Sequence, residues 1–459
     1  MRLSDRPAFQ KINAFFASPL YIAFLLILSI AAHLLALELV TYTVFTLIAV
    51  YVCFIGNDFL PAAPLFLFAY ILPSAQNNPG KNEASLFSGP GFFALAAVVC
   101  FSLLVFVIRN FKKLLSFKGK LLWGMLALCA AYLLSGIGSS AYSTVVFKNL
   151  LFAAAQGLCL LLPYLLLAAG TDWSKLRKDY LSWIGVCAGI LLLVEVFWSY
   201  CNGGVITDGV INRKKIFTGW GMYNNLGAML SMMIPFCFSL GIHHKKSWLG
   251  TILGFVFLVA TVMTCSRTSM VAALGIYAVC LLILLLSGTN RKRGFWTIGG
   301  LFTLVLIALV IFHEPILRLY SAFLGKITDP SSRHILFAEG WKQFLEAPVF
   351  SSSFYSPGYQ PWDFSTVDSF SSAFPPRWHN TFIQLLASCG VVGVAAYLWH
   401  RVQTVQLLFR KKNTHQLFLV CSILVLLGCS LLDCHFFNIG PVLFYSLLLA
   451  FWEFGVEAQ

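Results

Sequence analysis

Apolar runs of about 17–25 residues alternate with short polar connections along most of the chain, which is the length a helix needs to cross a bilayer. This pattern predicts an all-α polytopic membrane protein with about 12–14 transmembrane helices. The run at 59–73 is short and carries three prolines, so it also fits a re-entrant segment. The run at 20–37 is predicted to stay as a signal-anchor helix because no small-residue cleavage site clearly follows it.

The longest interruption of the apolar pattern lies at 313–379 and predicts one large loop. Within it, apolar residues recur at helical spacing over 315–327, which predicts a helix lying along the membrane surface. Residues 351–376 are rich in serine, proline and aromatic residues and predict an ordered loop or lid.

Two positions at helix starts in and beside this loop carry candidate chemistry. Asp329 is predicted to be the N-cap of a helix over 329–348. Arg333 and His334 then fall in its first turn, where a guanidinium and free backbone N–H groups can hold an anion together. His379 begins the next apolar helix, where the helix dipole favours the uncharged imidazole, the form that accepts a proton.

Composition supports a membrane protein, because only 10% of the residues are charged against about 25% in soluble domains. The net charge of +14 follows the positive-inside rule, so it indicates a membrane partner and no nucleic acid. With the N-terminus in the cytoplasm, 20 of the 31 basic residues lie on the inside and the large loop is extracytoplasmic. These residues are Arg2, Arg6, Lys11, Arg109, Lys112, Lys113, Lys118, Lys120, Lys175, Arg177, Lys178, Lys245, Lys246, Arg291, Lys292, Arg293, Arg401, Arg410, Lys411 and Lys412.

Some basic residues fall on the outside in this topology. Arg213, Lys214 and Lys215 form one such cluster, which indicates either an anionic substrate or a local error in the span count or lipid-headgroup contact. Arg267 is a lone cation between two apolar runs, and it fits either substrate contact or snorkelling to headgroups.

Other polar residues give weaker signals. The thirteen cysteines lie mostly in apolar runs without a CxxC spacing, so they are predicted to be small buried residues and not disulfides or metal ligands. Asp433, Cys434 and His435 could suggest a metal, but three such residues at a helix end are more typical of a local hydrogen-bonded cap. Glu195 interrupts an apolar run and either pairs with a basic group or lines a cavity.

Four segments, in order, resemble the O-antigen ligase and O-antigen polymerase superfamily. The segment HNTFIQLLASCGVVG at 379–393 is similar to the family stretch with His-Asn, Gln and two glycines. The segments GMYNNLG at 221–227 and TCSRTS at 264–269 resemble two further family motifs. Arg333, followed by Trp341 and Pro348, resembles the segment that opens the family's large outer loop.

This resemblance implies a multi-span, GT-C-like glycosyltransferase of the bacterial cytoplasmic membrane that inverts the sugar and uses no cofactor or metal. It implies an undecaprenyl-pyrophosphate-linked glycan as donor and another glycan, lipid or polymer as acceptor, with polysaccharide-export or chain-length proteins as possible partners. Arg267, Arg333 and the cluster at 213–215 are expected at the pyrophosphate, and His379 is expected to act as base or to orient the acceptor hydroxyl. Substrate contacts are also expected from Asn225, His334 and Asn380.

The expected organisation is an N-terminal bundle at 1–200, a catalytic region at 201–400 and C-terminal helices at 401–459. Three alternatives stand beside it. A transferase using polyprenyl monophosphate usually has two acids in its first outer loop, where this chain offers only Glu38. A lipid-glycan flippase without catalysis predicts repeated halves, which the sequence does not show. A structural or sensing protein leaves the outer cations unexplained.

Overall fold

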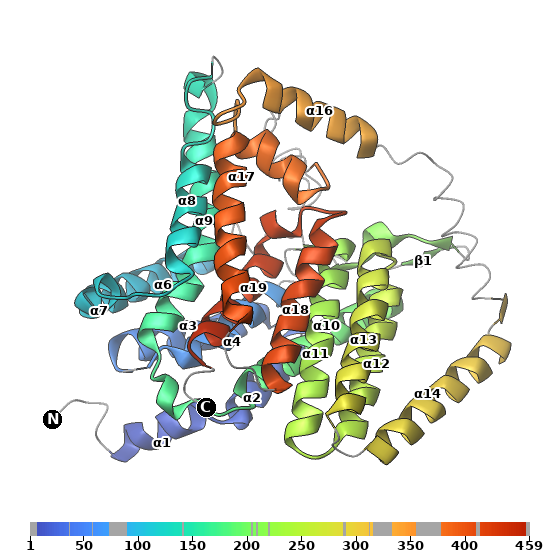
Figure 1. Ribbon diagram of the computed structural model, residues 1–459. Helices are drawn as coiled ribbons and strands as arrows, with labels where there is room; N and C mark the ends of the chain where they lie inside the picture. Colours follow the sequence, from blue (N-terminus) through green and yellow to red (C-terminus); the bar gives the residue numbers. More distant parts are fainter. Residues whose placement is uncertain are drawn as a thin grey trace.

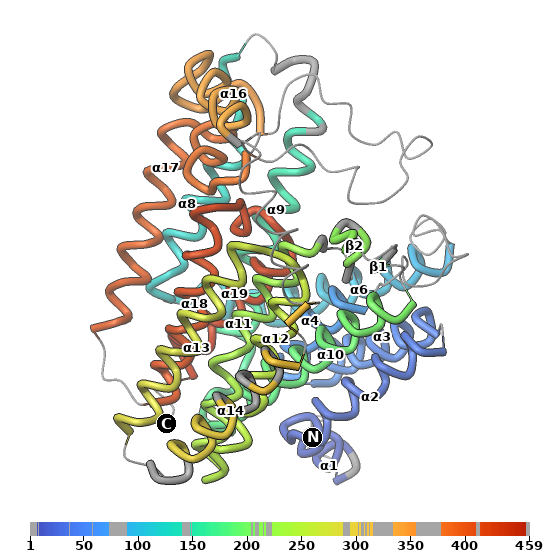
Figure 2. Tube along the Cα trace, turned by 90° about the vertical axis from the view of Figure 1, so that its right-hand side faces the viewer, coloured from blue at the N-terminus to red at the C-terminus, as the bar shows by residue number. Residues whose placement is uncertain are grey.

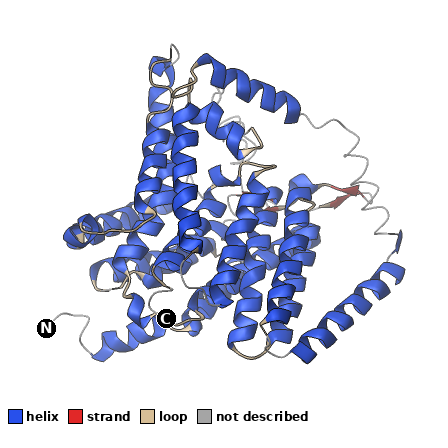
Figure 3. Ribbon diagram, in the orientation of Figure 1, coloured by secondary structure: helices blue, strands red, loops and turns tan. Residues whose placement is uncertain are grey.

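The computed structural model describes residues 7–35, 37–56, 58–72, 90–139, 142–202, 205–207, 210–218, 221–287, 291–311, 313–314, 333–354, 378–409 and 414–455. These residues are almost wholly helical (Figures 1 and 3). The exceptions include four strands of two residues each, which pair as two antiparallel hairpins, β1 with β2 and β3 with β4. The predicted surface helix at 315–327 and the predicted lid from 355 to 376 lie outside the described residues.

The first part of the chain holds these elements: α1 (Pro7–Phe16), α2 (Pro19–Leu35), α3 (Glu38–Phe54), η2 (Leu60–Ala62), α4 (Ala63–Ile71), α6 (Pro90–Arg109), α7 (Phe111–Leu115), α8 (Leu122–Leu133), α9 (Tyr142–Gly170), η4 (Trp173–Lys175) and α10 (Tyr180–Asn202). The second part holds β1 (Ile206–Thr207), β2 (Val210–Ile211), η5 (Arg213–Lys215), β3 (Phe217–Thr218), β4 (Gly221–Met222), α11 (Tyr223–His243), α12 (Ser247–Met263), α13 (Arg267–Leu286), α14 (Arg291–Ile311), α16 (Arg333–Glu346), α17 (Thr381–Leu408), α18 (Thr414–Ser430), η7 (His435–Phe437) and α19 (Ile439–Glu453).

Seven of the described helices are long and apolar enough to cross a membrane, or eight if the bent pair α1 and α2 counts as one span. Five further apolar helices have 10–17 residues. The chain is therefore a multi-pass membrane protein with an all-helical scaffold, as the sequence predicts. The predicted total of 12–14 spans exceeds the seven or eight that meet the length criterion.

Helix α11 forms the centre of the bundle and packs against α10, α12, α13 and α18. It is largely apolar, and 15 of its 21 residues are buried, as expected for a helix enclosed by other helices. Helix α16 lies across one end of the bundle, and α1 lies at the opposite end (Figures 1 and 2).

Helix α17 is interrupted at Gly390, whose φ of 62° and ψ of −159° are accessible only to glycine. At this break, Val391 N donates to Pro348 O over 2.9 Å. A Cβ on Gly390 would lie 2.4 Å from the same carbonyl oxygen, so the glycine of the family stretch makes room for the turn that follows α16. This contact fixes the first turns of α17 against α16.

One charged side chain lies where the sequence does not place it. Arg401, predicted to lie in a loop after the span at 380–400, lies within α17, so its placement in a loop is wrong. Its guanidinium carbon lies 4.4 Å from the ring centre of Tyr397, 4.9 Å from that of Phe436 and 5.1 Å from that of Tyr445. Aromatic rings from α17, η7 and α19 therefore surround this cation.

The buried acid of α10 has a partner. Glu195 Oε1 lies 3.1 Å from Nδ1 of His33 in α2, and both side chains are almost fully buried. The prediction that Glu195 pairs with a basic group is confirmed.

Candidate functional site

The centre of the candidate site is Asp433, which follows α18. Its Oδ1 lies 3.1 Å from Nδ1 of His379, and its Oδ2 accepts a hydrogen bond of 2.9 Å from Nδ2 of Asn224. The backbone N–H of Cys434 also donates to Oδ1. One carboxylate thus joins the loop before α17, the start of α11 and the end of α18.

Burial by itself raises the pKa of Asp433, but the hydrogen bonds that its carboxylate accepts from His379 and from the backbone N–H of Cys434, together with the nearby imidazoles, hold the pKa below its ordinary value. The carboxylate is therefore ionised and can only accept hydrogen bonds. Nδ1 of His379 consequently carries the proton in this contact, which leaves Nε2 of the neutral ring as a proton acceptor. The His379 side chain is 36% exposed against 7% for Asp433, so the imidazole can reach a substrate.

The local sequence builds the start of α17 around His379. Asn380 is the N-cap, and its Oδ1 accepts from the backbone N–H groups of Phe382 and Ile383. Its Nδ2 donates to Leu431 O over 2.8 Å and so ties α17 to the end of α18. His379 has a φ of 51°, an uncommon value for a residue other than glycine.

Gln384, the glutamine of the HNTFIQ segment, also has a structural role. Oε1 of Gln384 accepts from the backbone N–H of Trp378, the residue before His379. Its Nε2 donates to Ser388 Oγ within α17. Gln384 thereby supports the turn that presents the imidazole.

A second polar network lies beside the first. Oδ1 of Asn225 lies 3.1 Å from Nδ1 of His435 and accepts from Nδ2 of Asn438 over 2.6 Å. An amide oxygen only accepts, so His435 carries its proton on Nδ1. Burial lowers the pKa of His435, which favours the neutral ring. Asn225, expected as a substrate contact, thus fixes the segment that carries Asp433.

The TCSRTS turn packs directly on the start of α11. Ser269 Oγ donates to Asn224 O over 3.5 Å and lies 2.9 Å from Ser266 Oγ. A Cβ on Gly227 would lie 2.8 Å from Thr264 Oγ1, so this glycine permits the close approach. Arg267 is the half-buried first residue of α13, immediately after this turn. The sequence motif around Arg267 therefore lies beside the Asp433 network.

The structure describes only some of the other basic side chains expected at the site. The Arg213 guanidinium lies 4.9 Å from the ring centre of Tyr223, which directly precedes Asn224. Lys215 is exposed on η5. Arg333 and His334 are the first two described residues of α16, and His334 is exposed. The side chains of Lys214 and Arg333 and the predicted cap at Asp329 lie outside the described residues.

Asp433 and Asn224 are the site residues that sequence reasoning missed. The interpretation of 433–435 as a local cap is wrong in its main point, since Asp433 bonds His379 and Asn224 across 54 and 209 positions of the chain. The available signal was an acid and a histidine in a short break between two apolar runs, at the end of the bundle where His379 also lies.

With this geometry in place, comparison with known families is decisive: residues 252–398 match the family model for O-antigen ligase. The chain carries an O-antigen ligase domain. This match confirms the resemblance seen in the sequence. O-antigen ligases are enzymes. No curated protein and no solved structure matches the chain. The O-antigen ligase domain contains Arg267 and His379, whereas Asn224 and Asp433 lie outside it and complete the same site.

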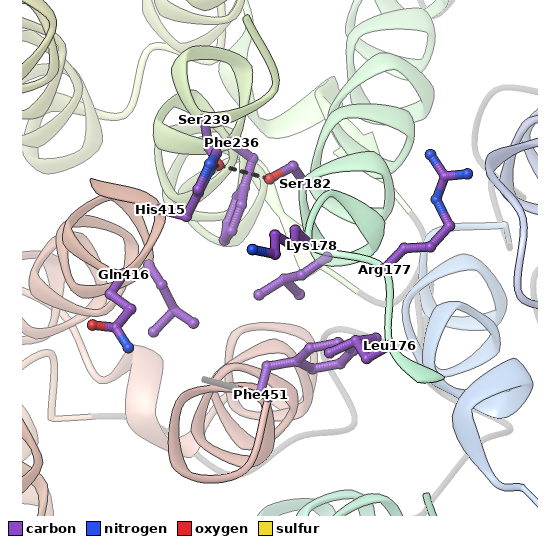
Figure 4. A pocket seen from close by; sticks show the side chains of 12 residues that line it. Leu176, Arg177, Lys178, Ser182, Phe236, Ser239, His415, Gln416 and Phe451 are labelled. Atoms are coloured by element: carbon purple, nitrogen blue, oxygen red, sulfur yellow. Dashed lines mark hydrogen bonds between the residues drawn. The ribbon is translucent and has the colours of Figure 1, made fainter. Parts of the chain in front are cut away.

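A small cavity lies at the C-terminal end of α11 and the N-terminal end of α18, away from this site (Figure 4). Ser239 and His415 line it, and Ser182 Oγ donates to Ser239 Oγ over 2.9 Å. Near it, Asp179 lies close enough to His243 and His244 for the three to share a metal ion. Asp179 already accepts hydrogen bonds from Arg177 and Trp183. Because these donors and the nearby basic side chains already satisfy its carboxylate, the three residues are better explained as a local ion-pair network than as a metal site.

Proposed function

We propose that this enzyme transfers a glycan from an undecaprenyl-pyrophosphate carrier to an acceptor glycan, surface lipid or polymer on the extracytoplasmic face of the bacterial cytoplasmic membrane. The observation that carries the proposal is the contact of His379 with the ionised Asp433, next to the turn that bears Arg267. Together these residues supply a base and a cation at one end of a membrane bundle, within reach of a lipid-linked anion.

In the proposed reaction, the acceptor hydroxyl gives its proton to Nε2 of His379 as its oxygen attacks the anomeric carbon. The bond from that carbon to the pyrophosphate oxygen breaks, and the electron pair leaves with the pyrophosphate. Asp433 stabilises the imidazolium that forms, because its carboxylate faces Nδ1. One displacement from the opposite face inverts the anomeric configuration.

Fixed cations stabilise the departing pyrophosphate in this proposal. Arg267, Arg333 and the cluster of Arg213, Lys214 and Lys215 take that role, which needs no metal. His334 and Asn380 complete the substrate contacts, and Asn225 acts through His435. The role of Arg213 is supported by its position over Tyr223, beside Asn224.

The orientation proposed from the charge pattern places the N-terminus in the cytoplasm. It is supported by Tyr180 Oη, which donates to Phe16 O and joins α1 to the bundle end that holds Arg177 and Lys178. Helix α16 lies at the other end (Figure 2). If the five shorter apolar helices also cross the bilayer, the total is 12 or 13 spans, within the 12–14 proposed for a GT-C-like bundle with a large outer loop over 313–379. We also propose that the chain divides into an N-terminal bundle at 1–200, a catalytic region at 201–400 and C-terminal helices at 401–459.

The test is glycan transfer by the purified enzyme reconstituted with a lipid-linked donor and an acceptor. His379→Ala and Arg267→Ala are each expected to abolish transfer while the proteins stay folded in the membrane. His313→Ala, an exposed histidine just beyond α14, is the matched control and is expected to keep full activity. Transfer is expected to continue in EDTA. Full activity of both site variants would refute the assignment, and strict metal dependence would refute the metal-free reaction.

A further inference from the structure

The small cavity shown in Figure 4 lies between four helices, at the end of the bundle remote from the Asp433 site. The start of α10, the C-terminal half of α11, the first described turn of α18 and the end of α19 form its walls. Its volume is about 40 Å³. This space holds roughly three water-sized groups, which is enough for oxygens of one phosphate and too little for a sugar ring or a nucleotide.

Lys178 is the charged side chain that points into this cavity, whereas Arg177 points away from it (Figure 4). The neighbouring acid is engaged elsewhere, because the Asp179 carboxylate accepts two hydrogen bonds from Arg177 and one from Nε1 of Trp183. Within the residues that the structure describes, Lys178 makes no ion pair. A positive charge therefore faces the cavity without a counter-ion from the described chain.

A second donor comes from the wall formed by α11 and α18. Ser182 Oγ donates to Ser239 Oγ over 2.9 Å, and Ser239 Oγ lies 2.8 Å from Nδ1 of His415. Ser239 gives its own hydrogen to Nδ1, so the neutral imidazole carries its proton on Nε2. Because His415 lines the cavity, its ring supplies an N–H donor at this wall.

The surroundings of the cavity favour a negative charge. Leu181 and Ser182 belong to the first turn of α10, and the dipole of this 23-residue helix is positive at that end. Phe236, Leu419 and Phe451 form apolar walls, which strengthen the attraction between a lysine and an anion. The described residues that line the cavity include no acid.

We propose that this cavity binds one phosphate group, whose oxygens accept from Nζ of Lys178 and from the ring N–H of His415. Phosphate carries a concentrated negative charge and several acceptor oxygens, which match a lysine and separate N–H donors. Inorganic phosphate and the phosphate of a lipid headgroup present the same chemistry. The bound group joins the starts of α10 and α18, and it uses none of the residues proposed for glycan transfer.

The first arm of the test measures thermal unfolding of the purified full-length protein in detergent. Inorganic phosphate replaces chloride at constant ionic strength, so that screening stays the same. The melting temperature is expected to rise with the phosphate concentration, and the titration gives a Kd. Lys178→Ala is expected to weaken this Kd about tenfold through loss of a charge-assisted contact. Lys175→Ala is the matched control, because this exposed lysine already pairs with Asp172 over 2.7 Å and lies outside the cavity.

The second arm identifies the source of the phosphate. Native mass spectrometry compares retention of phosphatidic acid with that of diacylglycerol carrying identical acyl chains. Preferential retention of phosphatidic acid that Lys178→Ala removes supports a lipid headgroup, whereas stabilisation by inorganic phosphate alone supports a free phosphate. The proposal is overturned if neither probe binds, if Lys178→Ala leaves the binding of both unchanged, or if Lys175→Ala weakens binding as much. Lys178 is exposed, so its variant is expected to fold, and neither arm depends on glycan transfer.

Discussion

Nδ1 of His379 and Oδ1 of Asp433 lie 3.1 Å apart although the two residues are 54 positions apart in the chain. The contact forms because the loop before α17 and the segment after α18 meet at one end of the bundle. It fixes the imidazole with Nε2 as the acceptor.

Asp433→Asn is expected to lower glycan transfer by roughly 10²–10⁴-fold, the contribution typical of a positioned acid–base group. The amide keeps the shape of the carboxylate but cannot stabilise an imidazolium. Transfer assays with saturating donor would measure the loss. Asp172→Asn, an acid at the opposite end, is the control, and equal activity of the two variants would contradict the role of Asp433.

Asp433 also predicts a pH dependence of stability. Its pKa is held below the ordinary value of 3.8, so it stabilises the folded protein above that value and this contribution is lost as the pH falls below it. Thermal unfolding of the purified protein across the acid range should show a steeper loss of stability for the wild type than for Asp433→Asn. Identical slopes for the two proteins would argue against the ionised carboxylate.

Gly390→Ala is expected to destabilise the protein and to reduce transfer. The substitution places a Cβ 2.4 Å from Pro348 O in a conformation that costs an L-residue about 1–3 kcal/mol before the clash is counted. Gly428→Ala in α18 is the matched control, because no atom lies within 4 Å of its added Cβ. The melting temperature in detergent distinguishes the two, and a similar small shift for both would refute the packing role of Gly390.

Arg401→Met is expected to loosen the segment that carries Asp433. The variant keeps much of the side-chain volume but loses the cation between Tyr397, Phe436 and Tyr445 and the 2.7 Å hydrogen bond from Nη1 to Tyr445 Oη. Cation–π contacts of desolvated groups contribute about 2 kcal/mol. Hydrogen exchange of residues 433–438 should increase in the variant, and unchanged exchange would show that the cage does not hold this segment.

The sequence predicts the helical membrane scaffold and the start of α17, because apolar run length and helix-cap residues are local signals. It also predicts His379, Arg267 and Asn225 near one another through the resemblance of short motifs. It does not predict Asp433 as the partner of His379, since that contact depends on how α11, α17 and α18 pack together. Arg401 was misplaced for a similar reason: aromatic rings far along the chain allow a cation to lie inside the bundle, where the charge pattern alone predicts a loop.

The most direct test of the account is a double-mutant cycle of transfer rates for the wild type, His379→Ala, Asp433→Asn and the double variant. If Asp433 acts through His379, the double variant is predicted to be no slower than His379→Ala alone. Losses that multiply, so that the double variant is slower than His379→Ala by the full Asp433→Asn factor, would contradict the account.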